Sequence, residues 1–307
     1  MNRHLVLLDF DGTIANTFKD SPSGMNVGVA SRQAISEVFG RNGALAYDES
    51  GGLRNREPGE LVSDISRMVR GNGLDNAANT DWFVQAKLSR IIPDISPEWP
   101  ELYPGVRDFL QTATNDGYWV DVGILSSGHN EFIERSLEVN GIDASSMIMV
   151  TSDLLRQREM PLRPRHKPHS YQFAEAHRQW LKRRGVLPLS VDAEGGASFT
   201  GRSYDKSNIL YVGDDPVKDG GLAQESRVPF VFVPFTKPGF TPDASRGQMQ
   251  VADFGDLGDI IGYQNGDRLA KGASFAQVLF GKNDQELFPP LADGEVYRRI
   301  LRERSFR

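Results

Sequence analysis

The chain has 307 residues, of which 39% are hydrophobic and 25% charged, enough for a packed core in one large domain or two smaller ones. Its net charge of −6 gives no basis for general affinity for nucleic acid or membranes, and the absence of cysteine excludes disulfides, thiolate metal sites and cysteine nucleophiles. No segment approaches the length of a membrane span, and the N-terminus lacks a signal-peptide pattern, so a soluble cytoplasmic protein is expected.

The first predicted strand, residues 5–8, ends in two carboxylates. Asp9 and Asp11 are one residue apart, and Gly12 then turns the chain into a loop. Side chains two positions apart point to the same side of a strand, here toward the carboxyl edge where open α/β sheets bind ligands. Two such acids repel each other unless a cation lies between them, and a divalent cation with oxygen ligands suits the pair. The alternative is a solvated Asp-Gly turn.

Residues 17–99 show three helical patterns and no strand. Apolar residues recur at helical spacing near 27–39, 61–69 and 81–92, and Gly40 is expected to end the first helix. We therefore predict a helical cap, inserted after the first strand. Arg54 and Arg56 lie in the loop between the first two helices and are candidate substrate contacts, the alternative being a solvated loop.

The rest of the chain predicts an α/β core. Helical patterns separate four further predicted strands at residues 118–125, 147–150, 208–212 and 230–233. This alternation predicts a Rossmann-like, mostly parallel sheet with helices on both faces. The predicted core comprises residues 1–16 and 100–262 and ends in a helix at 251–261. Residues 185–206 are expected to be an insertion or irregular hairpin, and residues 263–307 a C-terminal extension.

Polar residues follow several predicted strands. Ser126 ends the second strand and leads into Ser127 and Gly128, and Asp214, Asp215 and Asp219 follow the fourth, while Lys167 precedes Pro168 in the segment between them. If these groups share one sheet edge with the first two acids, the site holds a metal, a carboxylate nucleophile, a hydroxyl and an ammonium. That set suits phosphoryl transfer, in which Asp11 would protonate the leaving oxygen and then activate water.

The order of these motifs resembles that of the haloacid dehalogenase superfamily, in its phosphatase and phosphomutase branch with a helical (C1-type) cap. The matching motifs are Asp9-Phe10-Asp11-Gly12-Thr13, Ile124-Leu125-Ser126, Lys167-Pro168 and Gly213-Asp214. The resemblance implies a Rossmann-like core and a Mg²⁺-dependent aspartyl-phosphate mechanism. Dehalogenases of the superfamily lack an acid two residues after the nucleophile, so the acid at that position here favours phosphoryl transfer.

The resemblance also implies a role for each matching residue. Asp9 would be nucleophile and metal ligand, and Asp11 the general acid and base, offering its backbone carbonyl to the metal. Ser126 would hydrogen-bond the phosphoryl group, Lys167 would offset its charge, and Asp214 would hold the metal. Ser127 and Gly128 are expected to contact the substrate.

Two features depart from the superfamily pattern. The gap between Lys167 and Asp214 is long, so Lys206 is a second candidate for the lysine role if residues 185–206 are not an insertion. Asp214 is followed by a second acid, so Asp215 is a further candidate metal ligand. Asp214 is favoured as the direct ligand, and Asp219 is expected to support the metal site from behind the ligands or to reach the metal through water.

The expected function is that of a Mg²⁺-dependent phosphatase acting on a small phosphorylated metabolite. The alternatives are a phosphomutase of a sugar phosphate and a binding protein that keeps the fold without turnover. The sequence leaves the identity of the substrate and the oligomeric state open.

Overall fold

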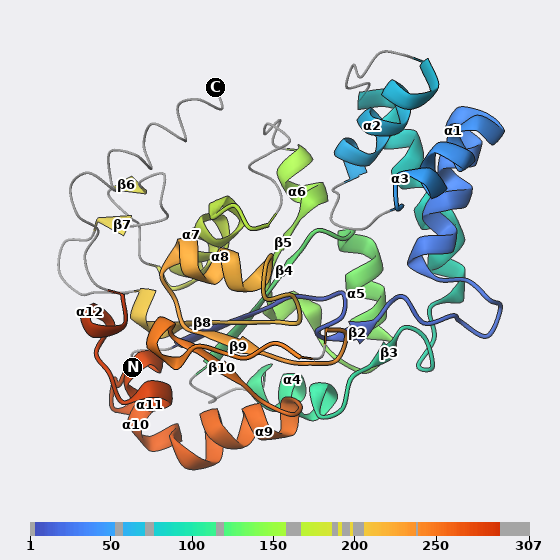
Figure 1. The fold of residues 1–307 in the computed structure, drawn as a ribbon. Coiled ribbons are helices and arrows are strands. Elements are labelled where there is room, and N and C mark those ends of the chain that lie inside the picture. Colours follow the sequence, from blue (N-terminus) through green and yellow to red (C-terminus); the bar gives the residue numbers. More distant parts are fainter. Residues whose placement is uncertain are drawn as a thin grey trace.

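A six-stranded parallel sheet forms the centre of the computed structural model, which describes residues 4–52, 58–70, 77–114, 120–157, 167–185, 190–191, 197–198, 206–237 and 239–288. The strands lie in the order β10-β9-β8-β1-β4-β5 (Figure 1). Their bounds are β1 His4–Leu8, β4 Val120–Ser126, β5 Ile148–Thr151, β8 Ile209–Gly213, β9 Phe230–Phe232 and β10 Gln248–Gln250. The predicted α/β Rossmann-like fold is thus confirmed.

Helices cover both faces of this sheet. Every side chain of β1 is therefore buried, and successive residues of β1 enter two separate hydrophobic cores. Val6 and Leu8 belong to one hydrophobic cluster, and Leu5 and Leu7 to the other. The first face is covered by α4 Val106–Thr114, α5 Asn130–Glu138 and α9 Phe254–Gly258. The second is covered by α6 Ser152–Gln157, α7 Tyr171–Arg183 and α8 Asp219–Ser226 (Figure 1).

Three helices form a separate group beyond one end of the sheet, which we call the three-helix unit (Figure 1). They are α1 Val27–Glu49, α2 Pro58–Arg70 and α3 Ala77–Ile91, and α1 packs on both others. The predicted stop at Gly40 is a kink instead: its φ of 70° interrupts the helical geometry, but the helix resumes and continues to Glu49. The chain enters the unit after β2 Ala15–Asn16 and returns through β3 Glu101–Leu102, which pair antiparallel.

The end of the core differs most from the sequence prediction. Strand β10, Gln248–Gln250, was not predicted because Gln-Met-Gln lacks a strand pattern, yet it pairs with β9 at the sheet edge. The helix expected at 251–261 starts only at Phe254 and continues as a π-helical segment, Asp259–Gln264. Within residues 185–206, β6 Ser190–Val191 pairs antiparallel with β7 Ala197–Ser198, and most of the remaining range lies outside the described residues.

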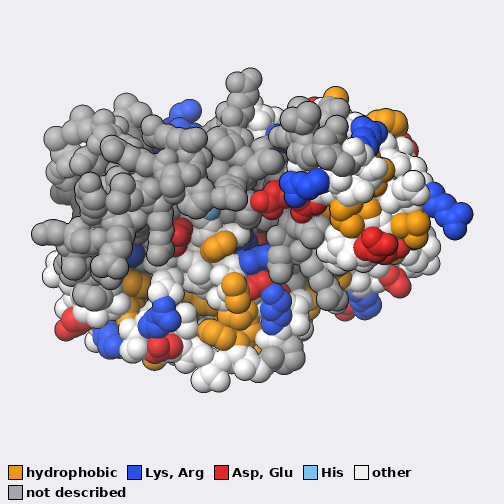
Figure 2. Space-filling view, turned by 45° about the horizontal axis from the view of Figure 1, so that its top comes forward, with side chains coloured by type: hydrophobic (Ala, Val, Ile, Leu, Met, Phe, Trp, Pro, Cys, Tyr) orange, Lys and Arg blue, Asp and Glu red, His pale blue; other side chains and the backbone are white. Residues whose placement is uncertain are grey.

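The C-terminal extension packs back on the start of β1. It contains α10 Gly266–Ala270, α11 Phe275–Phe280 and α12 Asp284–Leu287. The buried His4 ring hydrogen-bonds the carbonyl of Ala273 at 2.7 Å and meets the ring of Phe275 edge-on. Among the described helices, none is both long and apolar enough to span a membrane. On the described part of the face in Figure 2, acidic and basic side chains are interspersed with hydrophobic ones.

Candidate active site

Three adjacent strands bring the predicted acids and the serine to one edge of the sheet. β1 pairs in parallel with β8 on one side and β4 on the other, and Leu8 lies level with Val212 and Ile124. The residues that follow, Asp9, Ser126 and Asp214, therefore emerge at neighbouring strand ends. These side chains converge because parallel strands end at the same edge and because β8, β1 and β4 are neighbours in the sheet.

Lys167 lies between the carboxylates of Asp9 and Asp219. Its Nζ is 2.6 Å from Oδ1 of Asp9 and 2.8 Å from Oδ1 of Asp219, and only 3% of its side chain is exposed. Burial lowers the pKa of Lys167, but Asp219 and Asp9 outweigh it and raise the pKa above its ordinary value. The ammonium is therefore held charged beside the nucleophile candidate.

Asp219 supports this arrangement from the start of α8. Besides accepting from Lys167, its Oδ1 accepts the hydroxyl hydrogen of Tyr211 at 3.0 Å, and its Oδ2 accepts the backbone N–H of Asp215 at 3.1 Å. Both carboxylate oxygens thus have protein donors. This set of bonds fixes the side chain of Asp219, and through it the position of Lys167.

Asp9, Asp214 and Asp219 form an oxygen-rich group that fits a divalent cation. One carboxylate oxygen from each lies within 4.8 Å of the others. Thr13 donates to Oδ1 of Asp214 at 3.2 Å, and Thr236 donates to its Oδ2. Burial and the charge of Asp219 raise the pKa of Asp214 to about 6, and burial also raises the pKa of Asp9 well above its usual range despite the opposing charge of Lys167. Acids that resist ionisation together are suited to a hard cation that offsets their charge.

Asp11 is held separately from this group, on the side of the serine loop. Its Oδ1 accepts the hydroxyl hydrogen of Thr17 at 2.7 Å, and its Oδ2 accepts that of Ser126 at 3.5 Å. Ser126 in turn accepts the backbone N–H of Gly128 at 2.8 Å. The two acids of the first motif therefore have different environments, as different chemical roles require.

A pocket of about 430 Å³ opens above these residues, between the sheet edge and the three-helix unit. Its lining includes the predicted substrate contacts Ser127 and Gly128, whereas Ser126 is fully buried. Cationic side chains contribute much of the remaining wall: Lys87, Lys167, Lys218 and Lys237. Phe18, Val27 and Pro58 add apolar surface. The predicted contacts Arg54 and Arg56 lie outside the described residues.

Of the two alternatives left open by the sequence, Asp215 also lines this pocket, whereas Lys206 lies elsewhere. Oδ1 of Asp215 accepts the backbone N–H groups of Val217 at 2.9 Å and Lys218 at 3.0 Å, and Oδ2 pairs with Lys237. Burial acts to raise the pKa of Asp215, but these hydrogen bonds lower it below the usual value. Lys206 precedes β8 and so lies at the amino end of the strands, with its Nζ 5.8 Å from the Phe173 ring centroid.

Gly12 provides the close approach that the site needs. Its φ of 85° favours glycine, and a Cβ there would lie 2.6 Å from Oδ2 of Asp214. We expect Gly12→Ala to lower the free energy of unfolding by about 1–3 kcal/mol and to weaken Mg²⁺ binding. Gly24→Ala is the matched control, because Gly24 has a φ of 83° but no heavy atom within 4 Å of its Cβ position. Thermal unfolding and Mg²⁺ titration check this prediction, and equal Mg²⁺ affinity in both variants contradicts it.

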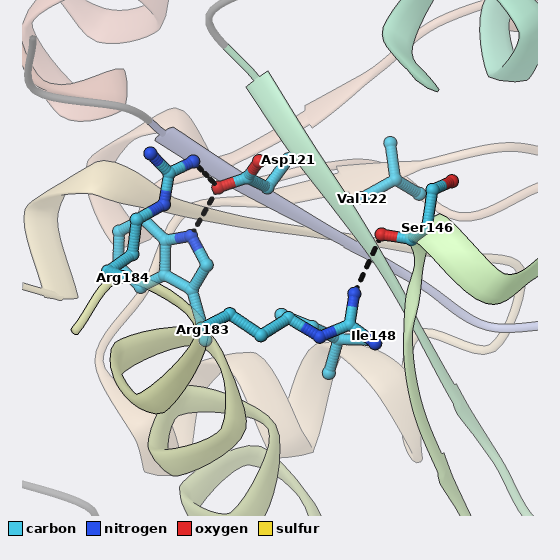
Figure 3. Close-up of a pocket in the computed structure, with 7 residues that line it drawn as sticks. Asp121, Val122, Ser146, Ile148, Arg183 and Arg184 are labelled. Atoms are coloured by element: carbon cyan, nitrogen blue, oxygen red, sulfur yellow. Dashed lines mark hydrogen bonds and ion pairs between the residues drawn. The ribbon is translucent and has the colours of Figure 1, made fainter. Parts of the chain in front are cut away.

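A second pocket, of about 360 Å³, lies at the opposite end of the strands (Figure 3). The Trp180 indole donates to Oδ2 of Asp121 at 2.6 Å, and the Arg184 guanidinium pairs with the same carboxylate. Arg183 is turned instead toward Ser146, to whose carbonyl it donates at 2.7 Å (Figure 3). These hydrogen bonds and this ion pair hold α7 against the amino ends of β4 and β5.

Comparisons with known proteins identify the family of the chain. A family model described as haloacid dehalogenase-like hydrolase matches residues 6–233, which is most of the chain. The chain belongs to this family. A search of curated proteins found no match.

Solved structures with a similar fold include three bacterial proteins. A hydrolase from Pseudomonas syringae is 16% identical, with 89% of this chain and 100% of that chain covered and a TM-score of 0.48. CbbY from Rhodobacter sphaeroides, solved as a mutant with xylulose-1,5-bisphosphate, is 16% identical, with 83% and 96% covered and a TM-score of 0.48. A haloacid dehalogenase-superfamily hydrolase from Geobacter sulfurreducens is 18% identical, with 85% and 97% covered and a TM-score of 0.43.

Sequence reasoning missed several residues of this haloacid dehalogenase-like site. Thr236 and Lys237 follow β9, so the rule that polar residues gather after parallel strands points to them as well. Lys87 carries a different signal. It lies four residues after Phe83 and four before Ile91, both fully buried, which places a charge on the apolar face of α3.

Proposed function

We propose that the chain is a Mg²⁺-dependent phosphatase that hydrolyses a small phosphorylated metabolite through an aspartyl-phosphate on Asp9. The observation that supports it most is that the two acids of the first motif, Asp9 and Asp11, have different neighbours at the sheet edge. Asp9 lies close to Lys167 and to the carboxylates of Asp214 and Asp219. Asp11 instead accepts hydrogen bonds from Ser126 and Thr17. A nucleophile beside positive charge and an acid placed apart from it are what two-step phosphoryl transfer needs.

Each residue then has a task in the reaction. Asp9 attacks phosphorus, and Lys167 offsets charge on the phosphate oxygens so that the anionic nucleophile can approach. Asp9, Asp214 and Asp219 would hold Mg²⁺, which would neutralise the phosphate and orient it for attack. Asp11 protonates the leaving oxygen and afterwards takes a proton from the attacking water. Ser127 and Gly128, which line the pocket, bind the phosphoryl group. The buried Ser126 hydroxyl holds Asp11 and the N–H of Gly128 in place behind them.

The three-helix unit acts as the cap of the site in this proposal. It supplies Val27, Pro58 and Lys87 to the pocket, so the part of the substrate that leaves lies against this unit. A pocket closed by a second structural unit excludes bulk water and strengthens the electrostatic interactions within it.

Hydrolysis of an aryl phosphate tests the proposal. We expect the purified protein to release phosphate with Mg²⁺ and to lose the activity when EDTA removes the metal. Asp214→Asn should raise the Mg²⁺ concentration needed for half-maximal activity by about 10–100-fold. Asp108→Asn, an exposed substitution on α4, should leave it unchanged. Activity that is the same in EDTA contradicts the metal requirement, and binding of Mg²⁺ without phosphate release from any ester favours the binding-protein alternative.

A further inference from the structure

A buried lysine of the three-helix unit lines the pocket at the catalytic edge, and among the described residues it has no hydrogen-bond or close ion-pair partner. Lys87 lies on α3, is 5% exposed, and lines the same pocket as Asp11 and Gly128. No described residue forms a hydrogen bond or a close ion pair with its ammonium, although Asp11 and Asp153 act on it at longer range. An ammonium in the wall of a pocket with no close anionic neighbour among the described residues is available to pair with an anionic group of a ligand.

A second unpartnered polar atom occurs near Lys87. His129 is 1% exposed, and its Nδ1 lies 3.1 Å from Oδ2 of Asp153. No partner among the described residues bonds its Nε2. Burial lowers the pKa of His129, and the charge of Lys87 lowers it further, against the opposing effect of Asp153. Burial likewise lowers the pKa of Lys87 to about 8, against the opposing charges of Asp11 and Asp153.

The position of Lys87 assigns it to the leaving-group side of the pocket. Lys87 comes from α3 of the three-helix unit, whereas Asp9 and Lys167 belong to the core, and all three line the same pocket. The charge of Asp11, the acid that serves the leaving oxygen, acts on Lys87. A ligand group that reaches Lys87 belongs to the organic part of the ester.

We infer that Lys87 is a specificity-determining residue that binds a second anionic group, a carboxylate or a further phosphate, on the leaving-group part of the substrate. This inference rests on the proposed phosphatase function. The described residues offer the Lys87 ammonium no hydrogen-bond acceptor. An anionic oxygen of the substrate would accept hydrogen bonds from it. The preferred substrates are then small phosphate monoesters that carry one further anionic group besides the phosphate that is hydrolysed.

Three matched esters test the inference: phenyl phosphate, meta-carboxyphenyl phosphate and meta-phenylene bisphosphate. We expect Lys87→Met to lower kcat/KM for the two doubly anionic esters by about 30-fold more than for phenyl phosphate, because a buried charge pair is lost. Lys87→Arg should retain part of the preference. Lys182→Met, on the exposed side of α7, is the control and should not change it. A selective loss with only one of the two doubly anionic esters supports the inference and identifies the group that Lys87 binds.

An equal loss with all three esters overturns the inference, because it shows that Lys87 acts on the reacting groups or on the fold. Calorimetric binding of meta-carboxyphenyl phosphate to Asp9→Asn, with and without Lys87→Met, gives a readout that needs no turnover. Weaker binding in the double variant supports the role of Lys87 even if the wild type hydrolyses none of the esters, a result that contradicts the phosphatase proposal alone. Equal binding in both variants overturns the role of Lys87.

Discussion

Asp9→Asn should reduce phosphate release from an aryl phosphate by about 10⁴-fold or more, because an amide cannot form the aspartyl-phosphate. The substitution keeps an oxygen that can accept from Lys167, and Lys167 keeps its second partner Asp219 at 2.8 Å. The variant should therefore fold as the wild type does. Steady-state kinetics and thermal unfolding of the same preparations separate lost chemistry from lost structure.

The intermediate itself gives a second measurement. Acid-quenched wild type, mixed briefly with substrate, should carry one added phosphoryl group on the peptide that contains Asp9, and the asparagine variant should carry none. Asp108→Asn is the matched control and should retain the modification and the activity. More than a tenth of wild-type activity in Asp9→Asn contradicts the nucleophile assignment. Transfer of the phosphoryl group back to a sugar phosphate, rather than to water, favours the phosphomutase alternative.

Lys167→Met should lower the free energy of unfolding by about 3–5 kcal/mol in EDTA at neutral pH, since it leaves buried carboxylates without their cation. Asp9 and Asp219 each lose an ion pair, of 2.6 and 2.8 Å respectively, and Asp214 stays close to both. Added Mg²⁺ should restore part of the stability, by about 2.7 kcal/mol at a concentration 100 times its Kd. Phosphatase activity should stay low, because the ammonium that offsets phosphate charge is absent.

The control for this experiment is Lys182→Met, which removes an exposed lysine from α7 and should change stability by less than about 0.5 kcal/mol. Denaturant unfolding in EDTA and in saturating Mg²⁺ measures all three proteins. If Lys167→Met is as stable as the wild type in EDTA, the carboxylates do not depend on the ammonium. If Mg²⁺ stabilises none of the proteins, the acidic group is not a metal site.

Much of the site follows from local sequence because parallel strands impose their own geometry. A short apolar run followed by a polar residue predicts both a buried strand and a group at the carboxyl edge, and Asp9, Ser126 and Asp214 all obey this rule. The same logic failed at β10, whose Gln-Met-Gln sequence has no strand pattern. It is a strand because it pairs with β9. This pairing depends on the neighbouring strand and cannot be read from the three residues themselves.

The roles of single side chains depended more on tertiary structure. Lys167 lies 52 residues before Asp219 in the chain, and no local pattern indicates that its ammonium joins Asp219 to Asp9. The adjacent acids Asp214 and Asp215 look equivalent in sequence. In the structure, Asp214 lies in the group that fits a cation, and Asp215 is bonded to the backbone of the next turn and to Lys237.

The sequence by itself determined the family, the α/β core and which acids follow the ends of the strands. Each of these rests on residue type, residue order and hydrophobic period. Tertiary structure decided which charges meet. It joined Lys167 to two acids and placed Lys87 of the three-helix unit against the pocket, because electrostatic pairing depends on distance and burial, which residues far apart in the chain acquire only on folding. The two acids of the first motif show both parts of this result: their spacing is read from the sequence, and their separate partners, Lys167 for Asp9 and Ser126 for Asp11, come from the fold.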